Sequence, residues 1–139
     1  MRNSYVSLAD SVEVFELNKK NTEIETYRGI DKVKAITLQS GDKEWFEYSF
    51  FYAVGIRLIE SNESKEKEGE NVAPLVEITS IFNAVYRSAE KIENNVIEEF
   101  SKDNVGYHVW PYWREFVQSA STRLNIPPLE TPLYFCSPE

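Results

Sequence analysis

The sequence contains one cysteine, one histidine and one methionine among 139 residues. A single thiol, Cys136, cannot close an internal disulfide or supply an all-cysteine metal site. Basic residues are in the minority too, because 15 Lys and Arg face 23 Asp and Glu, and the formal net charge is −8. This balance disfavours nucleic acids and anionic membrane surfaces as partners, since both attract basic proteins.

Long apolar runs and glycine clusters are also missing from the sequence. No stretch reaches the roughly 18–20 apolar residues that a membrane helix needs, and the first residues lack the apolar segment of a secretory signal. The five glycines are scattered, so there is no phosphate-binding loop. We therefore expect a cytoplasmic protein without membrane insertion. The length and the 42% of hydrophobic residues predict a single domain over residues 1–139 with a core of its own.

Residues suited to catalysis are few. His108 is the only histidine, and a lone histidine beside an aromatic segment is more often a packing or capping residue than a general base. A dyad of Cys136 with His108 is conceivable from residue type alone, which keeps a small hydrolase as a minor alternative. No His, Cys or carboxylate cluster has the spacing of a metal site. We therefore expect no enzyme, no metal and no cofactor.

Four segments with strand character come first along the chain. Residues 12–17 and 33–38 are rich in β-branched residues, and the second contains a slip in its alternation that predicts a bulge at 35–36. The strongest period-two pattern covers residues 46–58 and predicts a long strand with one buried face. A fourth strand is predicted over residues 76–86. The charged segment 61–71 between the last two strands is typical of a solvated hairpin loop, with a binding role as the alternative.

After the fourth strand, apolar residues follow helical spacing over 92–100, and Asn104 with Gly106 is typical of a helix end. Pro111 would then open a second helix. Asn125 and the proline pair that follows would end it. The order predicts an α+β domain in which a four-stranded antiparallel sheet, arranged as a meander, carries two helices packed on one face.

Aromatic residues are abundant, at 14% of the chain. On the face of the third strand that points away from the helices, Trp45, Phe51 and Ile59 leave an apolar remnant that suggests a partner. Aromatic rings offer large contact areas at low entropy cost, and a groove for unfolded chains would combine them with exposed sheet edges. Core packing is the alternative for most of these rings. The candidates for a client-binding groove are Phe46, Tyr48, Phe50, Tyr52, Trp110 and Trp113.

Two C-terminal segments carry a family resemblance. Residues 109–116 read VWPYWREF, and residues 122–135 read TRLNIPPLETPLYF. A Pro-Tyr-x-Arg-Glu segment at a helix start, then a Ser/Thr-Arg pair, a proline turn and an apolar Pro-containing stretch, is typical of SecB, the protein-export chaperone. The segment LVEITSIF at 75–82 is similar to the fourth strand of that family. The chain thus resembles the SecB-like chaperones.

The resemblance implies a SecB-like fold assembled as a homotetramer, a dimer of dimers. It also implies an ATP-independent holdase, whose partners are unfolded client polypeptides held in apolar grooves. The matching residues Tyr112, Arg114 and Glu115 are the expected oligomer interface. Arg114 and Glu115 have helix capping as their alternative role.

The family has two branches that differ in their partners. In the export branch, acidic residues on the sheet contact the SecA motor, and here Leu75 and Glu77 fit that site, with Glu16 as a further candidate. In the second branch, solitary SecB-like proteins protect an aggregation-prone antitoxin of a toxin–antitoxin pair. A further acidic residue of the SecA site and the extra C-terminal helix have no match here, which favours the second branch. The alternative to both is a SecB-fold adaptor that binds one specific folded partner.

Overall fold

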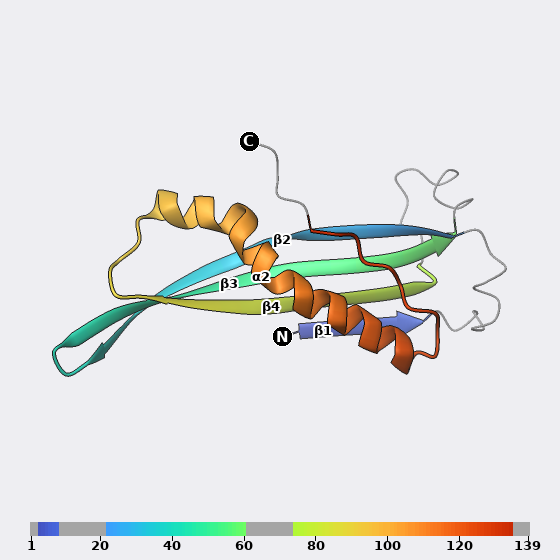
Figure 1. Cartoon of the computed structure of the whole chain (residues 1–139), viewed down its shortest axis with the longest axis horizontal. Coiled ribbons are helices and arrows are strands. Elements are labelled where there is room, and N and C mark those ends of the chain that lie inside the picture. The colour runs from blue at the N-terminus through green and yellow to red at the C-terminus, as the bar shows by residue number, and fades with distance from the viewer. Residues whose placement is uncertain (1–2, 9–21, 61–73, 135–139) are drawn as a thin grey trace.

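The computed structural model describes residues 3–8, 22–60 and 74–134, which form one antiparallel sheet crossed on one face by a helix (Figure 1). The expected α+β architecture with a four-stranded antiparallel sheet is confirmed. The expected second helix is not, because a single helix is found among these residues. The elements are β1 (Asn3–Leu8), β2 (Thr22–Ser40), β3 (Lys43–Glu60), β4 (Val76–Ser88) and α2 (Asn94–Arg123).

The strand order is β1-β4-β3-β2, so the meander holds only for the last three strands. β1 lies beside β4, where Asn3 pairs with Ile81 and Leu8 pairs with Val76. The segment predicted as the first strand, residues 12–17, lies outside the described residues, as does the charged loop at 61–71. β1 escaped detection because it is short and its Tyr5 is exposed, so it lacks a strong burial pattern.

β2 and β3 form a long hairpin. The predicted strand at 33–38 is the middle of the 19-residue β2. Gly41 has a left-handed φ of 61° at the first position of the two-residue turn, which glycine adopts without strain and which matches the twist of the strands. The register shift lies between Ile30 and Lys32, not at 35–36. β2 is an edge strand with mostly exposed side chains, so its hydrophobic pattern does not locate the bulge.

Helix α2 is continuous through Asn104, Gly106 and Pro111, so the expected break between two helices is wrong. Proline inside a helix removes one hydrogen bond and crowds the preceding turn. Figure 1 shows α2 bent, with its first turns running in a different direction from the rest. The helix persists because Val105 and Trp113, on either side of the proline, are both buried and tertiary packing outweighs the local penalty.

The C-terminal end of α2 is confirmed at the predicted residue. Asn125 has a φ of 58°, and asparagine tolerates this left-handed conformation better than most residues. The N–H of Ile126 donates to Ser121 O and the N–H of Asn125 donates to Thr122 O. This pair of bonds is the Schellman arrangement, which satisfies the last carbonyls and reverses the chain.

The core lies between α2 and the even-numbered face of β3. Val54, Ile56 and Val117 are completely buried there, and Trp113 is 1% exposed. On the opposite face of β3, Phe51 is 3% exposed. The ammonium groups of Lys32 and Lys34 lie 4.8 and 5.8 Å from its ring centre.

On the same face, Ile59 is 1% exposed, and the indole N–H of Trp45 is buried without a hydrogen-bond partner. The apolar remnant expected on this face is therefore largely buried.

Candidate functional site

β4 has an open edge along its second half. β1 pairs only with Val76–Ile81. Figure 1 shows β1 beside that half of β4, while the other half runs on toward the hairpin end with no strand on the same side. Among the described residues, no strand pairs with this edge of residues 82–88. Its unpaired N–H and C=O groups are available to add a strand from another polypeptide.

The first groove lies between the first turns of α2 and the hairpin-side ends of β3 and β4. It has a volume of about 330 Å³. Its aromatic wall is a cluster in which Tyr86 meets Phe50 and Phe100 edge to face, at ring separations of 5.5 and 4.9 Å. Edge-to-face rings add about 0.5–1.5 kcal/mol beyond burial, so these ring contacts stabilise the wall. The lining residues are Tyr48, Phe50, Tyr86, Arg87, Ser88, Ile92, Val96, Ile97 and Phe100.

The second groove lies directly along the open edge, between residues 82–86 of β4 and the middle of α2. Its volume is about 530 Å³. From the helix it is lined by His108, Val109, Tyr112, Glu115 and Phe116.

Tyr86 belongs to both grooves, and its hydroxyl shares a hydrogen bond of 2.8 Å with His108 Nδ1. The two grooves therefore meet at Tyr86. The lone histidine takes part in a packing contact at this junction. Its proposed dyad partner Cys136 lies outside the described residues.

The six aromatic candidates separate into groove and core. Tyr48 and Phe50 line the first groove, although their rings are 5% and 2% exposed. The Tyr48 hydroxyl accepts the N–H of Ile92 at 2.8 Å and so fixes the entry to α2. Phe46 is partly buried against the core. Tyr52, Trp110 and Trp113 are buried, and Trp110 also borders one cavity on the β2 side of the helix and another on its exposed side.

Several lining residues of the grooves were not predicted from the sequence. Tyr86 and Phe100 line the first groove together with Val96, whose side chain is 49% exposed at its mouth. The sequence does show the hydrophobic periodicity of the strand that contains Tyr86 and of the helix that contains Phe100. This periodicity does not show that the first turns of α2 lie at the end of the sheet, where the apolar residues between helix and sheet stay accessible.

The expected interface residues lie on the exposed side of α2. Tyr112 is 69% exposed, and Arg114 and Glu115 are exposed as well. They stand in the middle of the helix, so the capping role considered for Arg114 and Glu115 is wrong. Tyr112 and Glu115 also border the second groove.

Of the expected SecA contacts, Glu16 lies outside the described residues. Leu75 is 8% exposed and belongs to the core, whereas Glu77 is partly exposed on the outer face of the sheet. The ring of Tyr27 packs over Gly55 on that face. Burial, with the carboxylate of Glu77 as a second cause, raises the pKa of Tyr27.

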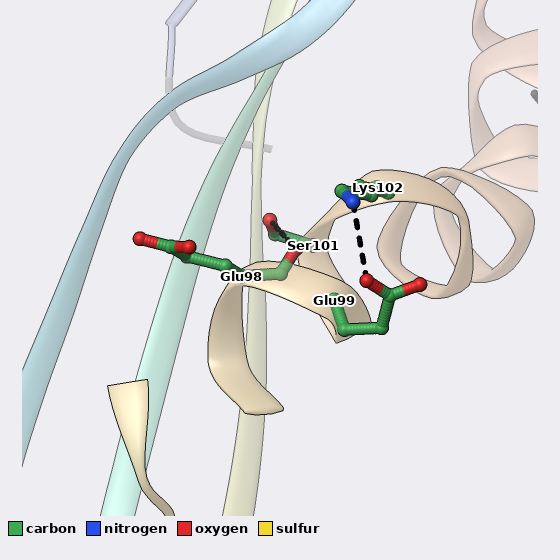
Figure 2. Close-up of polar contacts among 4 residues, drawn as sticks. All are labelled: Glu98, Glu99, Ser101 and Lys102. Atoms are coloured by element: carbon green, nitrogen blue, oxygen red, sulfur yellow. Dashed lines mark hydrogen bonds and ion pairs between the residues drawn. The ribbon is translucent and has the colours of Figure 1, made fainter. Parts of the chain in front are cut away.

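The paired carboxylates Glu98 and Glu99 are not arranged for acid–base catalysis. Figure 2 shows the two side chains pointing apart on the exposed side of α2. Glu99 pairs with Lys102 at 3.1 Å, one helical turn away. The hydroxyl of Ser101 donates to the backbone carbonyl of Glu98 at 2.7 Å. These contacts describe a solvated helix face.

Residues Pro127–Tyr134, here called the strap, follow the end of α2 without helix or strand structure. Figure 1 shows the strap running back beside α2 on the β2 side. The indole N–H of Trp110 donates to Pro132 O at 2.9 Å. The hydroxyl of Tyr134 donates to Asp103 O at 2.7 Å. The guanidinium of Arg28 lies 4.3 Å from the ring centre of Tyr134.

The hydroxyl of Tyr52 lies beneath the strap. Burial, followed by the neighbouring Tyr134, raises the pKa of Tyr52 to about 12, although Arg28 acts in the opposite direction. In an unfolded chain this phenol ionises near 10.0. Between these two values the unfolded chain loses the proton first and is favoured.

Stability should therefore fall as the pH rises from about 10 toward about 12. Tyr52→Phe should make this fall shallower, whereas Tyr112→Phe removes an exposed phenol and serves as the control. Denaturant titrations at stepped pH would measure both slopes. Burial also raises the pKa of Tyr86, so part of the fall should remain in Tyr52→Phe. Identical slopes for wild type and Tyr52→Phe would contradict the assignment.

Within residues 3–8, 22–60 and 74–134, no three His, Cys, Asp or Glu side chains gather as ligands for a metal ion. In the same part of the chain, no helix is both long and apolar enough to cross a membrane.

Comparison with known proteins places the fold. No family model and no curated protein matches the sequence. Among solved structures, the Mycobacterium tuberculosis Rv1957 SecB-like chaperone, in complex with a ChAD peptide from the Rv1956 HigA1 antitoxin, matches with a TM-score of 0.65. The match covers 98% of this chain and 86% of that chain at 11% sequence identity. Agreement over nearly the whole chain at this identity concerns the backbone, and the chain therefore has the SecB-like fold.

Proposed function

We propose that the protein is an ATP-independent holdase that binds extended segments of unfolded polypeptides. The observation that carries this proposal is the pair of apolar grooves that meet at Tyr86 beside the open edge of β4. The edge offers backbone hydrogen bonds to any sequence, and the grooves take alternate apolar side chains. This combination suits unfolded clients, which have in common an accessible backbone and apolar side chains. The adaptor alternative would instead require a surface that fits one folded partner.

The more specific form of the proposal is an antitoxin as the client. The similar structure is that of a chaperone in complex with an antitoxin peptide. Of the SecA-contact residues that the structure describes, Leu75 is buried and Glu77 reaches the surface only in part, which disfavours docking to SecA. A cytoplasmic homotetramer that uses Tyr112, Arg114 and Glu115 belongs to the same proposal. Several grooves on one assembly would raise the affinity for a long client.

Val96→Lys should weaken client binding about tenfold, which corresponds to about 1.4 kcal/mol. Val96 is 49% exposed at the mouth of the first groove. A client that covers this valine gains part of the roughly 1.5–3 kcal/mol available from burying it, and a lysine ammonium there must be desolvated. The measurements are the suppression of aggregation of a chemically unfolded protein and the anisotropy of a labelled unfolded client.

The matched control is Ile36→Lys. Ile36 is also 49% exposed, but it lies on β2 opposite Glu47 and outside both grooves. The two variants carry the same change in charge, so a general electrostatic effect would change client binding by the same amount in both. Weaker binding in Val96→Lys alone would therefore assign the effect to the first groove. Wild-type protein that neither delays aggregation nor gains the mass of a client in light scattering would refute the holdase and favour the adaptor.

A further inference from the structure

The strap is attached to the domain by the chemistry with which proteins bind extended peptides. The indole N–H of Trp110 donates a hydrogen bond to the carbonyl of Pro132. A side chain of the strap, that of Tyr134, lies against Arg28 and Trp110, with ring centres of Tyr134 and Trp110 5.4 Å apart. Aromatic-lined grooves recognise Pro-containing segments in this way because such segments are already extended and present free carbonyls. The strap is thus seated as a ligand would be.

Leu129 holds the start of the strap, because its N–H donates to Ser121 Oγ at 3.3 Å and its side chain packs against the core. The rest of the strap, residues 130–134, can leave without opening the sheet or the helix. Leu133 is 64% exposed, and the three prolines of the strap are exposed as well. The strap is not part of the sheet. The turn at Asn125 closes α2 before the strap begins.

The site beneath and beside the strap extends further than the strap fills. Gly106 keeps the helix surface flat there, since a Cβ at this position would lie 2.5 Å from the Tyr134 hydroxyl and 2.6 Å from the Tyr52 hydroxyl. A cavity of about 510 Å³ adjoins Tyr134 on the exposed side of the helix. Its lining residues are Tyr107, His108, Trp110, Pro111, Tyr112, Arg114 and Tyr134.

We propose that the strap is an internal ligand, and that an extended client segment with an aromatic residue close after a proline displaces it from Trp110 and Arg28. This inference rests on the proposed holdase function and adds a third, gated groove to it. The aromatic ring of the client takes the place of Tyr134 against the Arg28 guanidinium, a contact that any aromatic residue provides. The client carbonyl after the proline accepts the Trp110 N–H.

The test uses the full chain with Tyr134→Ala and a fluorescein-labelled peptide of the strap sequence, PPLETPLY. Because the strap of the variant no longer competes well for its own groove, the peptide should bind the variant about tenfold more tightly than the wild type, measured by anisotropy. Tyr5→Ala removes a tyrosine from β1, far from the strap in the sequence and 53% exposed, and this variant should bind the peptide as the wild type does. The same peptide with its final tyrosine replaced by alanine should not bind the wild type or either variant.

Tyr134→Phe, which keeps the ring and loses the bond to Asp103 O, gives a smaller increase in the same direction and replaces Tyr134→Ala if that chain does not fold. Equal binding to wild type and variant would overturn the inference. So would a Tyr134→Ala chain that dimerises by exchanging straps. Peptide binding without holdase activity would refute the proposed function alone. Holdase activity with unchanged peptide binding would refute the internal ligand alone.

Discussion

Trp113→Ala should lower the free energy of unfolding by about 3–5 kcal/mol, the usual loss for a buried tryptophan. Trp113 is 1% exposed on the sheet-facing side of α2. Its removal leaves a cavity between helix and sheet that the neighbouring side chains fill only in part. Since domains of this size are stable by only about 5–15 kcal/mol, a large share of the stability should disappear. Chemical denaturation followed by far-ultraviolet circular dichroism measures the loss.

The control for this substitution is Tyr5→Ala on β1, which removes a side chain that is 53% exposed and borders neither groove. It should change stability by about 0.5 kcal/mol or less. The comparison also separates core from groove. If Trp113 contacted clients rather than the core, Trp113→Ala would weaken client binding while leaving the denaturation midpoint close to that of Tyr5→Ala.

Gly106→Ala should lower the free energy of unfolding by about 2 kcal/mol, although alanine is the better helix former by about 1 kcal/mol. The new Cβ would lie 2.5 Å and 2.6 Å from two tyrosine hydroxyl oxygens. Tyr134 belongs to the strap and can move. Tyr52 is 3% exposed and cannot turn away, and such overpacking costs about 1–3 kcal/mol. Thermal and denaturant unfolding would measure the difference.

A double-mutant cycle tests the cause. In the Tyr52→Phe background the obstructing oxygen is absent, so Gly106→Ala should cost about 1 kcal/mol less than in the wild type. Gly29→Ala is the matched control, because a Cβ there meets nothing within 4 Å, and it should not destabilise the chain. Equal costs in both backgrounds would show that the close approach to Tyr52 is not the reason for the glycine.

The sequence was informative where one strand face is regularly apolar. The even-numbered residues of β3 are apolar over a long span because this face meets α2, and the predicted strand of 46–58 lies inside β3. Asn125 was identified as a helix end because asparagine accepts the left-handed conformation that this position takes. The residue type alone was enough to predict the local structure there.

Other parts of the fold depend on contacts between residues far apart in the sequence, which local sequence patterns do not reveal. Pro111 is typical of a helix start, and only the burial of residues before and after it keeps α2 continuous. β1 has no strong pattern, and its place beside β4 follows from pairing with residues far along the chain.

The sequence predicted an aromatic groove, but it identified only some of the residues that line it. Tyr48 and Phe50 line the first groove, but Trp113 belongs to the core. A period-two pattern identifies the buried face of a strand without showing where the covering helix ends, so the open wall at Tyr86 required the structure.

The place of β1 beside β4 also bears on the order in which the domain forms. The β2–β3 hairpin closes through a two-residue turn, whereas the hydroxyls of Ser4 and Ser80, 3.0 Å apart, join residues 76 positions distant in the chain. Closing so long a loop carries a larger entropy loss, and pairings of this kind form slowly. During synthesis β1 emerges first, and it has no pairing partner until β4 has been synthesised. We therefore expect the N-terminal strand to be the last to join the sheet, which amide-exchange labelling during refolding would show as late protection of Tyr5 and its neighbours.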